Sequence, residues 1–280
     1  MNKTPIIGLI RYSCRATFTS KKYFSPKYLN YRLNIFRNIT LKSFQNQTDK
    51  DFNIFLLHSV NLPDEYKEIF KILENQNAFL HNIYINDSEL EGSDYINAVE
   101  STVEYVNYIN DTAINFRIDN DDAVPDNFIE KLKQFLNPEF IDFVISFPNI
   151  SIIQRTGKNK YLLQKKYFPS NSIGLAYVTK KNNYKTIMTL GDHGKVNQKH
   201  LMLLVPGNGG IQTINGKNIM NSLYLGYTTS LSKDSMSSLL KNNNYYDFDF
   251  TCLNICKRNI MLETIIKSIN YAKKNIFTKS

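Results

Sequence analysis

Residues 113–132 read AINFRIDNDDAVPDNFIEKL, a stretch that joins an apolar run to three carboxylates within four residues. The run from Thr112 to Ile118 has the length of a buried strand, and a helical pattern follows from Pro125 to Leu136. Because neighbouring carboxylates repel one another, crowding them costs free energy unless a cation joins them. The stretch therefore predicts a strand followed by a helix. The carboxylates between them form a metal site, a helix cap or an ordinary acidic turn.

The same alternation of strand and helix patterns runs through the first half of the chain. Short apolar runs predict further strands at Pro5–Tyr12, Phe52–His58, Ala78–Ile85 and Ile141–Phe147. Apolar residues at helical spacing predict helices at Pro26–Gln45, Pro63–Leu73 and Ser93–Ile109. This order favours an α/β fold with a mostly parallel sheet flanked by helices.

The pattern changes after residue 147. Ile150–Gln154 and Tyr161–Gln164 predict a hairpin, and Ser172–Thr179 and Leu201–Val205 predict two more strands. We expect these to form a mixed extension that walls off one side of the candidate site. A closing helix is expected at Met261–Phe277. We predict one domain over residues 1–215, with residues 216–280 as a helical extension packed on it.

Composition narrows the class of protein. The chain has 280 residues, 42% of them apolar, which is ordinary for a soluble protein, and no run approaches the length needed to cross a bilayer. The opening MNKTPIIGLIRYSC lacks a long apolar core and a cleavage site, so we expect a cytoplasmic location. The net charge of +9 follows from Lys spread along the whole chain, and no nucleic-acid module is present, so no nucleic-acid partner is expected.

Polar side chains follow the ends of several predicted strands, where ligands bind in parallel sheets. Arg11 and His58 end two of them, and we assign both to donor or ligand binding. Asp119 and Asp121 share one side of an extended backbone, and two such carboxylates suit Mg²⁺ or Mn²⁺. The alternative is a polar loop that caps the next helix, but Asp126 alone can serve as that cap. The cluster therefore favours a metal site.

The segment FRIDNDDAVPDNFIEKL resembles the GT-A glycosyltransferases, whose Asp-x-Asp motif ends a central strand. It is more similar still to the rhamnosyltransferase family, which reads much like Phe-Arg-x-Asp-x-Asp-Asp-Ala here. LKSFQNQTDKDFNIFLLHSVNLPDEY and GLIRYSC resemble the same family, so the resemblance covers roughly residues 6–215. It implies a GT-A-like, Rossmann-type fold and metal-dependent transfer of a sugar, such as rhamnose, from a nucleotide-sugar donor to a glycan or lipid-linked glycan acceptor.

The resemblance also implies roles for single residues. Asp119 would help hold the donor sugar or its ribose, and Asp121 with Asp122 would bind the Mn²⁺ or Mg²⁺ that neutralises the donor diphosphate. Arg117 would contact phosphate or orient the cluster, with an internal ion pair to Asp119 as an equal alternative. Arg11 would face the nucleotide.

Asp192 and His193, in a turn between two glycines, form the second candidate group. His193 is a candidate late metal ligand, as many GT-A enzymes have, although a lone loop histidine is more often solvated. Asp192 is a candidate base for the acceptor hydroxyl. Relatives tend to carry His-Gly where this chain has Pro206-Gly207, so the alternative is a degenerate homologue that binds nucleotide or glycan without turnover.

Two further segments have plain interpretations. The loop Pro206–Gly210 lacks the spacing of a phosphate-binding fingerprint, so we expect a flexible loop over the site or a turn. The closing helix has one apolar face and several lysines elsewhere. It is expected to pack on the domain, with peripheral contact to the inner face of the membrane as the alternative.

Overall fold

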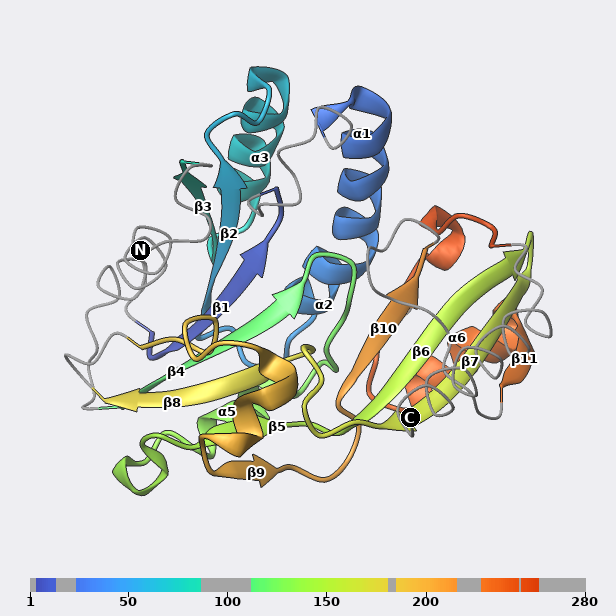
Figure 1. Ribbon diagram of the computed structural model, residues 1–280. Coiled ribbons are helices and arrows are strands. Elements are labelled where there is room, and N and C mark those ends of the chain that lie inside the picture. Colours follow the sequence, from blue (N-terminus) through green and yellow to red (C-terminus); the bar gives the residue numbers. More distant parts are fainter. Residues whose placement is uncertain are drawn as a thin grey trace, which may run out of the picture.

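The computed structural model describes residues 4–13, 24–86, 112–180, 185–215, 228–246 and 248–256. In these ranges the chain forms a seven-stranded sheet and a four-stranded sheet, set side by side (Figure 1). The helices predicted at Ser93–Ile109 and Met261–Phe277 lie outside the described residues.

The seven-stranded sheet carries the acidic stretch at the end of its middle strand, β4, in the order β3-β2-β1-β4-β8-β5-β9. Neighbouring strands from β3 to β4 are parallel, and β8 is antiparallel to both β4 and β5. The strands are β1 Ile6–Arg11, β2 Asn53–Ser59, β3 Leu80–Ile85, β4 Thr112–Asp119, β5 Val144–Ser146, β8 Leu175–Lys180 and β9 Met202–Leu204. The predicted mostly parallel α/β sheet is confirmed.

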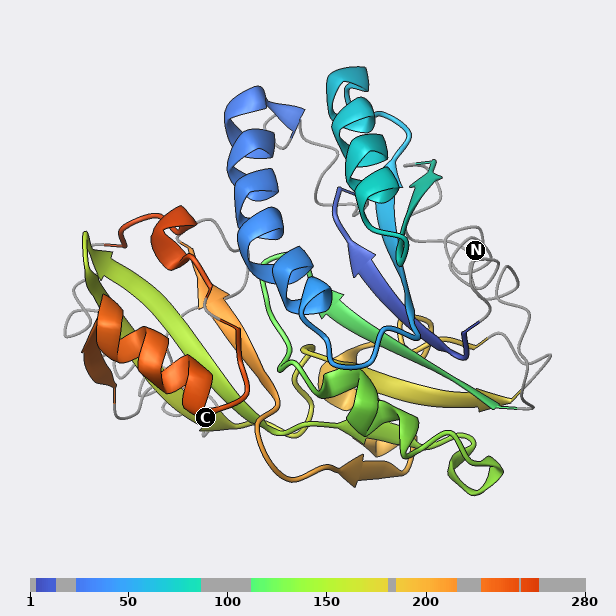
Figure 2. The same ribbon diagram turned by 180° about the vertical axis from the view of Figure 1, so that it is seen from behind.

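Helices cover one face of this sheet, in front of it in Figure 2. They are α1 Pro26–Ile35, continued through a π-helical turn at Phe36–Thr40 into α2 Leu41–Gln45, then α3 Asp64–Gln76 and α5 Phe128–Lys133. The short 3₁₀ helix His193–Gln198 packs Val196 against the other face. Strands β1, β2 and β4 are buried along nearly their whole length, as is usual for parallel strands, which explains the continuous apolar runs in the sequence.

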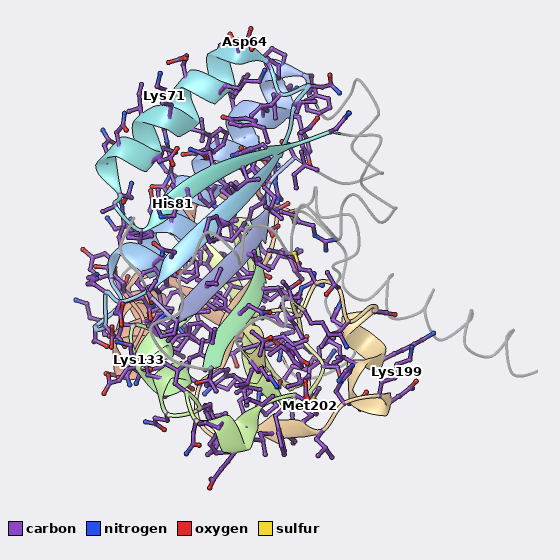
Figure 3. The ribbon with its side chains drawn as sticks, turned by 90° about the vertical axis from the view of Figure 1, so that its left-hand side faces the viewer. Asp64, Lys71, His81, Lys133, Lys199 and Met202 are labelled. Atoms are coloured by element: carbon purple, nitrogen blue, oxygen red, sulfur yellow. The ribbon has the colours of Figure 1, made fainter. Side chains whose placement is uncertain are left out.

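The side-chain view gives the extent of the sheet. His81 on β3 and Asp64 and Lys71 on α3 lie toward one end, and Met202 on β9 lies at the other (Figure 3).

Helix α5 begins at Phe128, later than the predicted Pro125, because the chain turns at residues 125–127 before it enters the helix.

The four-stranded sheet has the order β10-β6-β7-β11, and helix α6 packs on it. Its elements are β6 Asn149–Gly157, β7 Lys160–Tyr167, β10 Gly210–Ile214, β11 Thr229–Ser232 and α6 Lys233–Asn242. The predicted hairpin is thus present but belongs to a second sheet. Since β10 precedes residue 215 and β11 follows it, the sheet joins both sides of the predicted domain boundary, which stays a prediction.

The segment before β2 braces the exit of the acidic stretch, although it lies 78 residues earlier in the sequence. The buried amide of Gln47 donates to the carbonyl of Pro125 at 2.7 Å and accepts from the backbone N–H of Ile129 at 3.0 Å. The N–H of Thr48 donates to the carbonyl of Asp126 at 2.8 Å. The segment before β2 therefore fixes the start of α5 and, with it, the loop that carries the carboxylates.

We expect Gln47→Ala to lower the free energy of unfolding by about 1–3 kcal/mol, because it leaves buried backbone groups of Pro125 and Ile129 without partners. Urea denaturation followed by circular dichroism measures the change. Gln76→Ala, at an exposed position at the end of α3, is the matched control and should stay within about 0.5 kcal/mol of the parent. Equal effects of the two substitutions would contradict the bracing role.

Candidate functional site

Asp119 lies at the carboxyl end of β4, directly opposite Arg11 at the end of β1 in the parallel register. One guanidinium nitrogen of Arg117 (Nη2) is 3.7 Å from Asp119 Oδ1, and Ser172 Oγ donates to Asp119 Oδ2 at 3.3 Å. The Asp119 side chain is 42% exposed, whereas that of Arg117 is 8% exposed. Asp119 is therefore a carboxylate that a ligand can reach at this edge of the sheet.

Electrostatic effects show which charged groups surround Asp119. Burial raises its pKa, but Arg117, Arg11 and His193 together lower it by more, so its pKa lies below the ordinary value. Burial lowers the pKa of His193, and Arg117 lowers it further, against the opposing effects of Asp119 and Asp192. Arg11, Arg117, Asp119 and His193 are thus near enough for their charges to influence one another, and the roles predicted for them stay predictions.

Asp121 is bound by the protein itself. Its Oδ2 accepts from Arg32 Nη1 at 2.9 Å and from Asn215 Nδ2 at 3.0 Å. The side chains of Arg32 and Asp121 are only 10% and 6% exposed. The cation that joins this carboxylate is therefore a guanidinium from α1.

Asp122 is fully buried. Its Oδ1 accepts from the N–H of Thr213 on β10 at 3.1 Å, and within the described residues its Oδ2 has no hydrogen-bond partner. Burial, and then the charges of Asp121 and Asp119, raise the pKa of Asp122 well above its usual value. Backbone hydrogen bonds in both directions between Ala123 and Ile211, at 3.0 and 2.8 Å, hold the loop against β10. Asp122 thus belongs to the junction between the two sheets.

These contacts do not fit the Mn²⁺ or Mg²⁺ site predicted at Asp121, Asp122 and His193. Among the residues that the structure describes, no group of three His, Cys, Asp or Glu side chains could hold a metal ion. Asp121 Oδ2 already has two protein donors, and Asp122 is inaccessible. His193 instead lies beside Asp192, with 3.7 Å between its Nδ1 and Asp192 Oδ1.

His58 does not reach the site. It is fully buried, its Nε2 is 3.0 Å from Asn82 Oδ1, and its ring contacts those of Phe70 and Tyr84 at centroid distances of 4.4 and 5.2 Å. Burial lowers its pKa to about 3, against the smaller opposing effect of the Asn82 hydrogen bond. His58 is a neutral core residue, so assigning it to donor binding does not fit the structure.

Asp192 begins the short 3₁₀ helix that carries His193. Its Oδ1 accepts from the N–H of Gly194 at 3.0 Å, and its side chain is 61% exposed. This position leaves the carboxylate accessible and next to His193, whose pKa the charge of Asp119 raises. The role predicted for Asp192 as the base stays a prediction.

The glycine-rich loop before β10 is a packing feature. A Cβ on Gly209 would lie 2.3 Å from the carbonyl oxygen of Phe147, and one on Gly210 would lie 2.3 Å from Ile173 Cγ2. The strand before Pro206, β9, is three positions from β4 in the sheet order. In this half of the chain, the residues that bind Asp121 and Asp122 come later: Thr213 on β10 and Asn215 directly after it.

Four contact residues escaped the sequence interpretation: Arg32, Ser172, Thr213 and Asn215. Only Arg32 left a signal. It falls between Leu29 and Leu33 on the buried face of a helix, where an unpaired charge is costly. A charged residue inside an apolar stripe predicts a buried partner, although it does not say which one.

Comparisons with known proteins point to one family. The family model described as "Putative rhamnosyl transferase" matches residues 6–223. A search of curated proteins found no match.

Solved structures give only distant likenesses. S. aureus TarS 1-349 is 11% identical with a TM-score of 0.42, covering 74% of this chain and 60% of that chain. Its complex with UDP-GlcNAc is 10% identical with a TM-score of 0.42, covering 85% and 64%. The inositol-1-phosphate CTP transferase from T. maritima is 13% identical with a TM-score of 0.36, covering 76% and 89%. The chain thus spans about 60% of the TarS 1-349 chain, and TM-scores this low transfer neither ligand nor activity.

Proposed function

This chain belongs to the Putative rhamnosyl transferase family, and we propose that it transfers a sugar from a nucleotide-sugar donor to a hydroxyl of a glycan or lipid-linked glycan. It is a glycosyltransferase with a GT-A-like α/β fold. The observation that carries the proposal is the meeting of Arg11, Arg117 and the accessible carboxylate of Asp119 where β1 and β4 end. Ligands of open α/β sheets bind at such an edge. In keeping with the family description, the proposed sugar is a deoxyhexose such as rhamnose.

The proposed chemistry assigns one task to each group. Arg11 and Arg117 face the diphosphate of the donor, and Asp119 accepts hydrogen bonds from hydroxyls of its ribose or sugar. The acceptor oxygen attacks the anomeric carbon while the bond from that carbon to the diphosphate breaks. The nucleoside diphosphate leaves with the bonding electrons, and Asp192 takes the proton of the acceptor hydroxyl.

The acceptor and the location of the protein belong to the proposal as well. No helix in the described ranges is long and apolar enough to span a membrane. The cytoplasmic location and a peripheral contact with the inner membrane face stay predictions, and the closing helix that suggested the contact lies outside the described residues.

A panel of nucleotide sugars tests the function by thermal shift. A donor at about 100 times its Kd should stabilise the native state by about 2.7 kcal/mol, which corresponds to roughly 5–10 °C in Tm for a chain of this size. Free sugars at the same concentrations are the control and should give no shift. If none of the UDP-, dTDP- or GDP-linked sugars raises Tm, the proposed donor class is wrong.

A further inference from the structure

The acidic stretch that suggested a metal site meets cations supplied by the protein. Asp121 receives a guanidinium from Arg32, and Asp119 lies 3.7 Å from a guanidinium nitrogen of Arg117. Arg11 stands opposite Asp119 in the sheet register. Arginines thus accompany both carboxylates: Arg32 pairs with Asp121, and Arg117 and Arg11 lie beside Asp119.

The partners of Asp121 are held in place in turn. Tyr31 Oη donates to the backbone carbonyl of Asn215 at 2.9 Å, and Asn254 Nδ2 donates to the same oxygen at 3.4 Å. The amide of Asn215 therefore approaches Asp121 from a fixed position, and Arg32 approaches it from α1. A divalent cation at Asp121 Oδ2 would have to displace a buried guanidinium that is already paired.

The accessible part of the cluster is better suited to an anion. Arg11 is half-buried at the strand end, and in the described part of the chain no hydrogen bond or ion pair engages its guanidinium. A metal ion beside Asp119 would meet the repulsion of Arg11 and Arg117, whereas a diphosphate would meet their attraction. Guanidinium groups also bind pairs of phosphate oxygens through parallel N–H···O hydrogen bonds.

We propose that Arg11 and Arg117 neutralise the diphosphate of the donor and of the departing product in place of a divalent cation, with Arg32 as the fixed counter-ion of Asp121. This inference rests on the proposed function, because a nucleotide-sugar donor supplies the diphosphate. In this proposal, side chains of the protein take the place of the metal ion that the acidic motif implied.

Isothermal titration of UDP, dTDP and GDP into the full chain tests the inference. The nucleoside diphosphate that binds should do so with the same Kd, within about threefold, in excess EDTA, in Mg²⁺ and in Mn²⁺, since protein charges do the work of the cation. Binding that appears only with a divalent cation would overturn the inference and leave the proposed function standing. Absence of binding under all three conditions would overturn both.

Two variants and one matched control locate the charges that bind the nucleotide. In EDTA, Arg11→Gln should weaken nucleoside diphosphate binding by about 10–100-fold, the loss of a charge-assisted hydrogen-bonding group. Arg37→Gln, at an exposed position in the π-helical turn after α1, should leave it unchanged. Asp121→Asn should still bind the nucleotide without metal. Unchanged binding by Arg11→Gln in EDTA, or loss of binding by Asp121→Asn there, with the variants folded by circular dichroism, would overturn the inference.

Discussion

Arg32→Met should lower the free energy of unfolding by about 3–5 kcal/mol, because it leaves the Asp121 carboxylate buried without its charged partner. The pair is almost fully enclosed, with 2.9 Å between Arg32 Nη1 and Asp121 Oδ2. Burial by itself lowers the pKa of Arg32, but Asp121, together with Tyr28 and Tyr12, outweighs this effect, so that the pKa of Arg32 is raised. Urea denaturation of the parent and the variant measures the difference.

The double variant Arg32→Met with Asp121→Asn separates the ion pair from simple packing. Removing both charges should recover most of the stability lost in Arg32→Met, since a neutral pair of similar volume carries no uncompensated charge. Arg37→Met, on the exposed side of the same helical segment, should cost less than about 0.5 kcal/mol. A cost below about 1 kcal/mol for Arg32→Met itself would show that the ion pair does not hold the acidic loop.

The sequence predicted the sheet and the place of the acidic stretch because both depend on local patterns. Apolar runs of strand length and helical spacing gave the order of elements from β1 to α5, and the order placed residues 119–122 at a carboxyl edge. The need for a cation beside crowded carboxylates was also predictable. Its identity was not, because Arg32 lies 89 residues before Asp121 and its helix had to be packed against the sheet first.

The remaining differences come from contacts between distant segments. The hairpin after residue 147 forms its own sheet with β10 and β11, and no local pattern tells a strand which sheet it joins. Asp122 accepts a hydrogen bond from Thr213 on β10, 91 residues later in the sequence. His58 looked like an edge residue, but β2 continues to Ser59 and aromatic rings enclose the imidazole.

Asp192→Asn should lower kcat for sugar transfer by about 100- to 10,000-fold, the usual contribution of a positioned general base. Asparagine caps a helix as well as aspartate does, so the bond to the N–H of Gly194 is kept and only the proton acceptor is lost. Release of nucleoside diphosphate from the donor, in the presence of a glycan acceptor, measures the rate. Donor affinity should stay within about threefold of the parent, because Asp192 does not hold the diphosphate.

Asp234→Asn is the matched control, since Asp234 is an exposed carboxylate in the first turn of α6 on the second sheet. It should leave both kcat and donor affinity unchanged. Full activity of Asp192→Asn would show that Asp192 is not the general base. A parent protein that binds the donor but releases no nucleoside diphosphate with any acceptor would support the binding-only homologue instead.

Photo-crosslinking tests the position of the donor site most directly. An azido analogue of the nucleotide sugar that stabilises the protein is irradiated with the full chain, and labelled peptides are mapped by mass spectrometry. The account predicts adducts in peptides that carry the ends of β1 and β4, at Arg11–Ser13 and Asp119–Asp122, which excess unlabelled nucleotide suppresses. Adducts confined to β6, β7 and β11 of the second sheet would contradict it.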